Sequence, residues 1–190
     1  SEAFPKLKWI IGLRGDPPSY ALKWDELLSR AESVPATTVA QIADKLHCND
    51  AINIQYTSGT TGHPKGATLS HRNVLLNAFY AGQSQRLGPS DRLALPVPLY
   101  HCFGCMLGTM CCLVHGSAMI FPSECFSAAA TLDAIEKERC TALYGVPTMF
   151  IAQLEHPSYA GRDLSSLRTG IMAGSPCPIE LMKHVTADMG

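Results

Sequence analysis

Apolar and polar residues follow two alternating periods along the chain. Short apolar runs predict strands at residues 7–13, 51–56, 92–97, 118–121, 141–145 and 167–174. Helical spacing predicts helices between them, at residues 21–32, 71–87, 102–116, 128–140, 146–155 and 179–189. In the run 128–140, Ala128, Leu132 and Ile135 fall on one face, and Glu136 and Lys137 on the other. Strands that alternate with helices predict an α/β fold, with a mostly parallel sheet covered by helices.

Local signals support several of these elements. Ser70 precedes the helix at 71–87 and can cap its N-terminus, and Pro147 suits the first turn of the helix at 146–155. Gly104 and Gly108 stand four residues apart in the run 102–116. We expect these two glycines to allow close packing inside the core.

Composition and charge narrow the class of protein. The chain has 190 residues, 46% of them hydrophobic, and a net charge of -1. This is a globular composition, and without a basic surplus nucleic-acid binding is not expected. The longest apolar run, CFGCMLGTMCCLV, is too short to be a transmembrane segment, and no signal peptide opens the chain. Because the sequence starts without Met and stops at Gly190 directly after a helix, we expect a fragment of a longer intracellular protein.

Cysteines suggest one alternative class. Cys102 and Cys105 form a Cys-x-x-Cys pair, which could be half of a zinc site or a redox pair. No second pair with suitable spacing follows, so we expect reduced thiols, and in the run 102–116 small packing residues on a buried helix. The full set is Cys48, Cys102, Cys105, Cys111, Cys112, Cys125, Cys140 and Cys177.

The segment YTSGTTGHPKG, residues 56–66, breaks the pattern because it has almost nothing apolar to bury. Its small residues expose backbone N–H groups, which can form a concave anion site, and its glycines allow close approach to a ligand. Pro64 stiffens the end of the segment, and Lys65 adds a cation. Hydroxyl donors come from Thr57, Ser58, Thr60 and Thr61. Together these groups suit a polyphosphate.

This loop differs from a Walker loop. A Walker loop has glycine, four residues and then Gly-Lys-Ser/Thr, whereas Gly59 is followed by TTGHP and Lys65. The next residues, GATLS, read as a strand rather than a helix. Hydroxyls, backbone amides and Lys65 must therefore supply the positive potential that a helix N-terminus supplies in Walker proteins.

YTSGTTGHPKG resembles the signature of the adenylate-forming superfamily, which includes acyl-CoA synthetases, luciferases and peptide-synthetase adenylation domains. LSHRNVLLNA, PLYHCFG, LYGVPTMF and GIMAGSPCP are also similar to segments of that superfamily. The likeness runs from about Phe4 to Gly190 and is closest to a mitochondrial, medium-chain branch of the acyl-CoA synthetases. It implies that residues 1–190 are part of the large N-terminal AMP-binding domain.

The resemblance implies a reaction in two steps. A carboxylate, here of a fatty acid, attacks the α-phosphate of ATP to give acyl-AMP, and the thiol of coenzyme A then displaces AMP. Mg²⁺ would bridge the phosphates, and Thr60 would be the residue that touches it. The carboxylate is already ionised at neutral pH, so the first step needs no general base.

Site residues follow from the same resemblance. His101 would border the acyl pocket, although a lone His beside an aromatic residue also fits a structural role, and both interpretations stay open. The expected phosphate contacts are Thr57, Ser58, Gly59, Thr60, Thr61, Gly62, His63, Pro64 and Lys65, and the expected adenine contacts are Gly174, Ser175 and Pro176.

The family's Mg²⁺-binding Glu, ribose-binding Asp and catalytic Lys would lie beyond Gly190, the Lys in a small C-terminal domain. We therefore expect no catalytic residue in these 190 residues and no adenylation activity from them alone. Two other functions remain open beside the zinc-binding domain. One is another adenylating enzyme, specific for an aryl acid or an amino acid, and the other is a non-catalytic nucleotide-binding module. A mitochondrial location rests on the resemblance alone.

Overall fold

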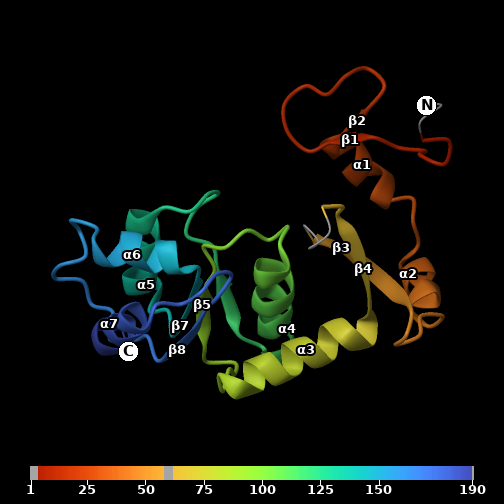
Figure 1. Ribbon diagram of the computed structural model, residues 1–190. Helices are drawn as coiled ribbons and strands as arrows, with labels where there is room; N and C mark the ends of the chain where they lie inside the picture. The colour runs from red at the N-terminus through yellow and green to blue at the C-terminus, as the bar shows by residue number, and fades with distance from the viewer. Residues whose placement is uncertain (1–3, 58–61, 190) are drawn as a thin grey trace. The chain divides into compact units, whose positions relative to one another are not determined.

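The computed structural model describes residues 4–57 and 62–189 (Figure 1). The chain divides into two compact units, Ser1–His47 and Cys48–Gly190, and each is described by itself. None of the helices in the described residues combines the length and the apolar character that crossing a membrane requires.

The first unit consists of short elements. Strands β1 (Ile11–Gly12) and β2 (Leu22–Lys23) pair in parallel, and helices α1 (Trp24–Ala31) and α2 (Ala36–Ala43) follow. The predicted strand at 7–13 was therefore too long, and α2 was not predicted. No described residue of this unit is buried, and Trp9 is 59% exposed. Without a core to bury it, the apolar run at 7–13 has little to hold it in an extended strand.

A four-stranded parallel sheet forms the centre of the second unit. Its strands are β5 (Arg92–Ala94), β6 (Ala118–Ile120), β7 (Ala142–Gly145) and β8 (Thr169–Met172), in the order β6-β5-β7-β8. All four residues of β7 are buried, as expected for a central strand with helices on both faces. The predicted α/β fold with a mostly parallel sheet is confirmed.

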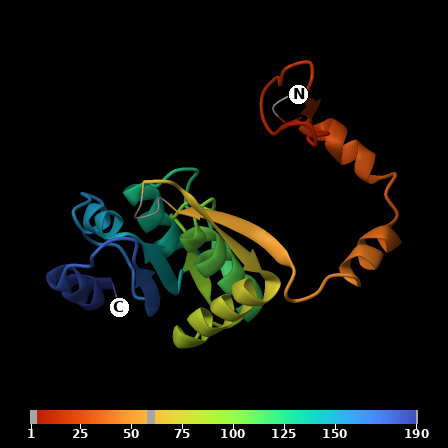
Figure 2. The same cartoon turned by 45° about the vertical axis from the view of Figure 1, so that its right-hand side comes forward.

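Helices cover both faces of this sheet (Figures 1 and 2). One face packs on α3 (His71–Ser84), the π-helix η1 (Phe103–Met110) and α4 (Cys111–His115). The other face packs on α5 (Ala128–Glu138), α6 (Pro147–Leu154) and α7 (Ile179–Met189). Because side chains alternate along a strand, Tyr144 of β7 belongs to the first core and its neighbour Leu143 to the second.

The helix predicted at 102–116 begins as a π-helix. A Cβ atom added at Gly104 would lie 2.3 Å from the carbonyl oxygen of Pro98, and one added at Gly108 would lie 2.6 Å from Leu95 Cδ2. These contacts confirm that the two glycines allow close packing. They bring η1 against the segment that follows β5.

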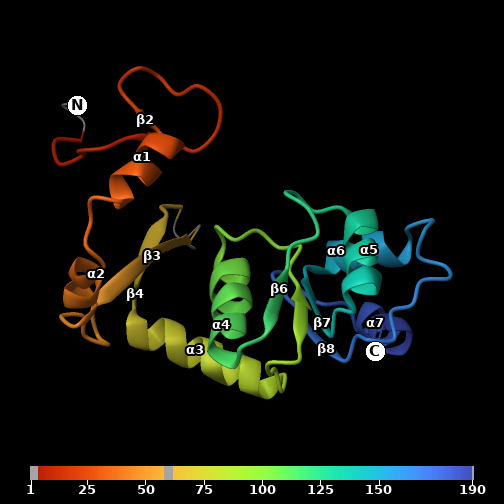
Figure 3. The ribbon, with the colours of Figure 1, turned by 180° about the vertical axis from the view of Figure 1, so that it is seen from behind.

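The residues around the glycine-rich loop form an antiparallel hairpin outside the parallel sheet. Its strands are β3 (Ala51–Thr57) and β4 (Lys65–Ser70), with Thr57 opposite Lys65. Figure 3 shows β4 running directly into α3. The predicted N-cap is confirmed, because the Ser70 side chain accepts a hydrogen bond from the backbone N–H of Asn73 at 3.3 Å.

A buried carboxylate joins the end of α3 to the sheet. Asp91 is 5% exposed and accepts hydrogen bonds from the backbone N–H of Gly88 at 2.8 Å and from Thr141 Oγ1 at 2.6 Å. Arg168, next to β8, donates to Asp91 from Nε at 3.1 Å and also to the carbonyl oxygen of Arg86 at 2.8 Å. Burial by itself would raise the pKa of Asp91, but the hydrogen bonds and the charge of Arg168 outweigh it, and the pKa is lowered.

The thiols separate into buried and exposed groups. Cys111, Cys112 and Cys140 are buried, and burial raises their pKa values to about 11, about 12 and about 11. Cys102 is exposed, so the prediction that it is a buried packing residue was wrong. Within residues 4–57 and 62–189, no group of three or more His, Cys, Asp or Glu side chains could hold a metal ion.

Candidate functional site

The carboxyl edge of the parallel sheet brings together two of the segments singled out from the sequence. The segment 95–101 leaves the end of β5, and the turn that contains Gly174 leaves the end of β8. The strand β7 lies between them and ends next to Val146. Ligands of open α/β sheets bind at this edge, so its loops form the candidate site.

The glycine turn after β8 has a backbone that only glycine adopts readily. Gly174 has a φ of 91°, and a Cβ atom added there would lie 3.0 Å from Val146 Cγ1. Gly174, Ser175 and Pro176 are all exposed. The expected adenine contacts therefore stand in one exposed turn at the sheet edge, where a flat ring can approach the backbone.

Only part of the glycine-rich loop lies in the described residues. Four loop residues lie outside them: Ser58, Gly59, Thr60 and Thr61. Thr60, the expected Mg²⁺ contact, is therefore not described. Thr57 ends β3, Lys65 begins β4, and both are exposed. Gly62 has a φ of 83°, and a Cβ atom added at Gly66 would lie 2.9 Å from Ile54 Cγ2. The residues after Lys65 form the strand β4 rather than a helix, as predicted.

The hairpin and the glycine turn belong to different sheets. Among the described residues, no hydrogen bond or ion pair joins Thr57 or Gly62–Lys65 to Gly174–Pro176. His63 and Pro64 are exposed beside Lys65. The segment 95–101 and the glycine turn thus lie at the carboxyl edge of the parallel sheet, whereas the expected phosphate loop belongs to the separate β3–β4 hairpin.

His101 stands at the start of η1 and is exposed. Its Nδ1 accepts a hydrogen bond from the backbone N–H of Phe103 at 3.1 Å, so the neutral ring carries its proton on Nε2. Cys102 Sγ lies 3.7 Å from the same nitrogen. His101 thus helps to cap the first turn of η1, and its Nε2 edge is not used by this cap.

An apolar groove of about 530 Å³ lies along the segment that leads to His101. Its lining includes no cationic residue. The residues that line it are Leu95, Pro96, Val97, Pro98, Leu99, Tyr100, Phe121, Ser123, Glu124, Cys125, Phe126 and Met149. The groove can take an apolar chain but offers no positive charge to a phosphate.

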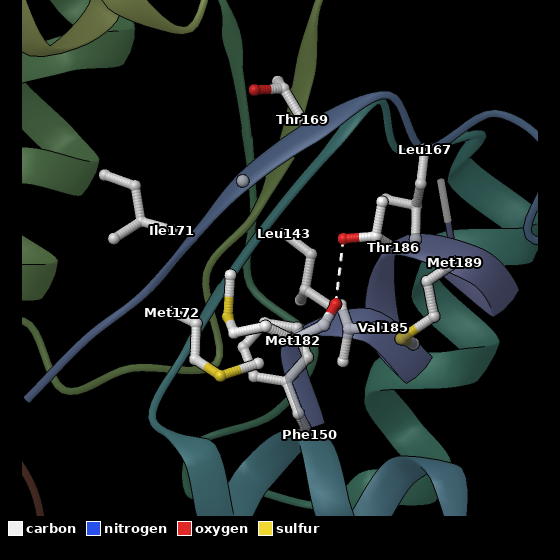
Figure 4. A pocket seen from close by; sticks show the side chains of 11 residues that line it. Leu143, Phe150, Leu167, Thr169, Ile171, Met172, Met182, Val185, Thr186 and Met189 are labelled. Carbon is white, nitrogen blue, oxygen red and sulfur yellow. Dashed lines mark hydrogen bonds between the residues drawn. The ribbon is translucent and has the colours of Figure 1, made fainter. Parts of the chain in front are cut away.

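A smaller cavity of about 120 Å³ lies between α7 and the strands β7 and β8 (Figure 4). Its lining carries no charged side chain, and the hydroxyl of Thr186 donates to the carbonyl oxygen of Met182 at 2.9 Å. The lining residues are Leu143, Phe150, Leu167, Thr169, Gly170, Ile171, Met172, Met182, Val185, Thr186 and Met189. We interpret this cavity as a packing gap beneath α7.

Two neighbours of the glycine turn were not identified from the sequence. Val146 packs against Gly174, and Cys177 Sγ lies 3.3 Å from the carbonyl oxygen of Met172. Both residues belong to segments that the sequence singled out, LYGVPTMF and GIMAGSPCP. The contact of Val146 with the turn depends on how β7 and β8 pair, and that of Cys177 depends on how the chain turns at Gly174.

A parallel sheet with an exposed glycine turn at its carboxyl edge, preceded in the chain by a hairpin, is the architecture of an open α/β protein that binds its ligand at that edge. The family model described as AMP-binding enzyme matches residues 4–190. The chain therefore belongs to the AMP-binding enzyme family.

Curated relatives match the whole chain. It is 47% identical over 190 residues to the putative acyl-CoA synthetase YngI of Bacillus subtilis, covering 100% of this chain and 34% of that protein. It is 46% identical over 195 residues to the mitochondrial medium-chain acyl-CoA ligase ACSF2 of Danio rerio, covering 100% of this chain and 32% of that protein. The chain thus spans about a third of the length of these relatives.

Solved structures share the fold. The anthranilate CoA ligase AuaEII in complex with anthranoyl-AMP matches 97% of this chain and 35% of its own, with a TM-score of 0.79 and 26% identity. ATP-bound MatB from Rhodopseudomonas palustris matches 75% of this chain and 28% of its own, with a TM-score of 0.65 and 30% identity. These similarities agree with the α/β architecture and with a nucleotide site.

Proposed function

We propose that the chain is part of the N-terminal domain of an acid–CoA ligase that forms acyl-AMP from ATP and transfers the acyl group to coenzyme A. The observation that carries the proposal is the exposed Gly174 turn at the carboxyl edge of the sheet, in a chain whose relatives are named as acyl-CoA synthetases or ligases. Because the chain spans about a third of those relatives, the complete activity belongs to the longer protein.

The glycine-rich loop would hold the triphosphate. Thr57 and Lys65 face each other at the loop end of the hairpin, so their hydroxyl and ammonium groups would flank the loop between them. Ser58, Gly59, Thr60, Thr61, Gly62, His63 and Pro64 complete the loop. Donors placed where negative charge builds on the departing pyrophosphate would lower the barrier of the first step.

Gly174, Ser175 and Pro176 would contact the adenine. The missing side chain of Gly174 leaves the peptide planes on both sides of it open to a flat ring, and the turn projects from the same edge as the segment that leads to His101. Acyl-AMP joins adenylate and acyl group in one molecule, so the two binding regions must lie within reach of one ligand.

An apolar acid substrate is supported by the groove of about 530 Å³ that leads to His101. The relatives named ACSF2 are medium-chain acyl-CoA ligases, and we propose a medium-chain fatty acid as the substrate. An aryl acid is the second candidate, because AuaEII, named as an anthranilate CoA ligase, shares the fold over 97% of this chain.

Mg²⁺ and coenzyme A would be required as well. The loop offers hydroxyl and ammonium groups but no carboxylate, so Thr60 is the proposed Mg²⁺ contact within residues 1–190, beside phosphate oxygens and the Glu expected beyond Gly190. When bound, Mg²⁺ would neutralise phosphate charge.

The remaining parts of the proposal concern the rest of the protein. A C-terminal domain with the catalytic Lys would complete the enzyme, and residues 1–190 alone would not form acyl-AMP. A mitochondrial location is suggested by the ACSF2 relatives, while YngI comes from a bacterium.

The test is ATP-dependent thioester formation by the full-length protein with fatty acids of graded length and with aryl acids. We expect a maximum at medium chain length and a loss of about 100-fold in kcat/KM for Lys65→Ala, since a single oxyanion-stabilising donor contributes about 2.7–4 kcal/mol. Lys183→Ala is the matched control, because Lys183 is exposed on α7 and its ion-pair partner is Glu180, three residues away. Normal turnover by Lys65→Ala would remove Lys65 from the phosphate site, and no thioester with any acid would disprove the function.

A further inference from the structure

A thiol spans the glycine turn. Cys177 Sγ lies 3.3 Å from the carbonyl oxygen of Met172, the last residue of β8, and 3.6 Å from the carbonyl oxygen of Ser175. A thiol is a weak donor with one proton, so the two carbonyl groups share it. The contact connects the end of the strand to the far side of the turn.

Two further contacts hold the turn from the side of β7. The backbone N–H of Ala173 donates to the carbonyl oxygen of Gly145 at 3.2 Å, which extends the pairing of β7 and β8 by one bond. Val146 then packs against Gly174, where a Cβ atom would lie 3.0 Å from its Cγ1. The turn is therefore supported at both ends, and Gly174, Ser175 and Pro176 remain exposed between the supports.

We propose that Cys177 is a positioning residue for nucleotide binding: its thiol holds the Gly174 turn in the conformation that receives the adenine. The inference rests on the proposed function of this turn. Cys177 needs no contact with the nucleotide in this role. It acts through the carbonyl groups of Met172 and Ser175, and it restricts the backbone between them before the ligand arrives.

This role predicts a specific kinetic pattern. Without the thiol the turn samples other conformations, and the apparent affinity for ATP falls by the fraction of molecules that hold the competent one. Because a single hydrogen bond contributes modestly, we expect a rise of about threefold to tenfold in the KM for ATP with Cys177→Ala. Turnover at saturating ATP should stay within about twofold, because bound nucleotide restores the turn.

The experiment uses the full-length protein with three variants. Cys177→Ala removes the donor, Cys177→Ser keeps a donor, and Cys48→Ala removes an exposed thiol that precedes β3 and lies in neither the groove nor the turn. The measurements are KM for ATP, kcat, the Kd of AMP, the thermal midpoint and amide hydrogen exchange of residues 173–177 without nucleotide. We expect Cys177→Ala alone to raise KM and Kd and to speed exchange in the turn, and Cys177→Ser to restore most of both.

The outcomes separate this inference from the proposed function. A wild-type protein that binds neither ATP nor AMP would overturn both. Wild-type binding with unchanged KM and exchange in Cys177→Ala would overturn the inference and leave the function standing. A lowered thermal midpoint with equal loss of kcat and kcat/KM would show a purely structural role for Cys177. Failure of Cys177→Ser to restore affinity would show that hydrogen-bond donation is not what positions the turn.

Discussion

At the scale of single residues, Gly174 gives the most direct test of the nucleotide site. Its φ of 91° costs a residue with a side chain about 1–2 kcal/mol, and an added Cβ atom would lie 3.0 Å from Val146 Cγ1, which is tighter than an ordinary contact. We therefore expect strain and crowding together to shift the turn in Gly174→Ala. We predict that this variant of the full-length protein raises the KM for ATP by about tenfold or more, measured from initial rates with varied ATP.

Gly161→Ala is the matched control for this prediction. Gly161 also has a positive φ, of 84°, but no atom lies within 4 Å of an added Cβ. The variant should lose about 1 kcal/mol of unfolding free energy through backbone strain alone and keep its KM for ATP. A similar rise in KM in both variants would mean that strain, rather than the shape of the turn, weakens binding.

The thiols give a second prediction at this scale. Burial raises the pKa values of Cys111 and Cys140 to about 11 and that of Cys112 to about 12, so almost none of each is thiolate at neutral pH. We predict that iodoacetamide leaves these three cysteines unmodified in the native protein. The exposed cysteines should react: Cys48, Cys102, Cys125 and Cys177. Peptide mass spectrometry after native and denatured labelling measures both groups, and native labelling of Cys112 would contradict the described packing.

At the scale of elements, η1 depends on its two glycines. A Cβ atom at Gly104 would lie 2.3 Å from the backbone carbonyl oxygen of Pro98. Because this oxygen belongs to the backbone, it cannot move away by a change of rotamer as a side-chain atom could. We predict that Gly104→Ala lowers the unfolding free energy by about 1–3 kcal/mol, measured by urea unfolding. Gly88→Ala is the control, since nothing lies within 4 Å of its added Cβ. Equal stability of both variants would show that η1 tolerates a shift away from Pro98.

The connection between α3 and the sheet depends on Asp91. Asp91→Asn keeps the shape of the side chain but removes the charge that faces Arg168, which should cost about 2 kcal/mol at neutral pH. The pKa of Asp91 is lowered from its ordinary 3.8, so its stabilising charge is fully present above that pH and is lost as the pH falls through the folded-state value. The variant should therefore show a shallower loss of stability below about pH 4 than the wild type.

Urea unfolding at a series of pH values checks this prediction, with Asp16→Asn as the control. The Asp16 side chain is 92% exposed and pairs with Lys23, so its replacement should change stability by less than about 1 kcal/mol. Glu136 and Asp163 also have lowered pKa values, and for this reason the acid loss should be reduced rather than abolished in Asp91→Asn. Parallel pH profiles of the Asp91 variant and the wild type would contradict the assignment.

At the scale of the whole molecule, the sequence predicted what local patterns encode. The helices at 71–84 and 128–138 have marked caps or apolar faces, and β7 is a short apolar run between turns, so each could be located from its own residues. The residues of the glycine turn were found through family resemblance. Their exposure at the carboxyl edge then followed from the parallel order of the strands.

Pairing and burial could not be predicted in this way. The partner of β3 is β4 in antiparallel order, although an apolar strand after a helix suits a parallel sheet equally well. The run 7–13 was predicted as a strand because it is apolar, but it lacks a buried partner, and only Ile11 and Gly12 pair. The thiol of Cys177 reaches Met172 only after the chain has turned at Gly174. Each of these features depends on residues brought together by folding.

Exposed apolar surface leads to the last prediction. No described residue of the first unit is buried, and on β3 Ile52 is 45%, Ile54 58% and Tyr56 74% exposed. A two-stranded hairpin with an open apolar face is marginally stable in water, and such surfaces promote association. We predict that the isolated 190-residue chain self-associates and binds the dye ANS. Because the chain spans about a third of its relatives' length, we further propose that a protein of their full length covers this surface and does neither.

Sedimentation velocity at several protein concentrations measures the association, and ANS fluorescence reports the open apolar surface. The double variant Ile52→Thr/Ile54→Thr keeps two β-branched residues in the strand but removes apolar area. The hairpin should therefore persist, and association of the isolated chain should decrease. The same double replacement at the buried Leu132 and Ile135 should instead unfold the chain. An isolated chain that stays monomeric at every concentration and does not raise ANS fluorescence would contradict this prediction, because its own residues would then cover β3 in solution.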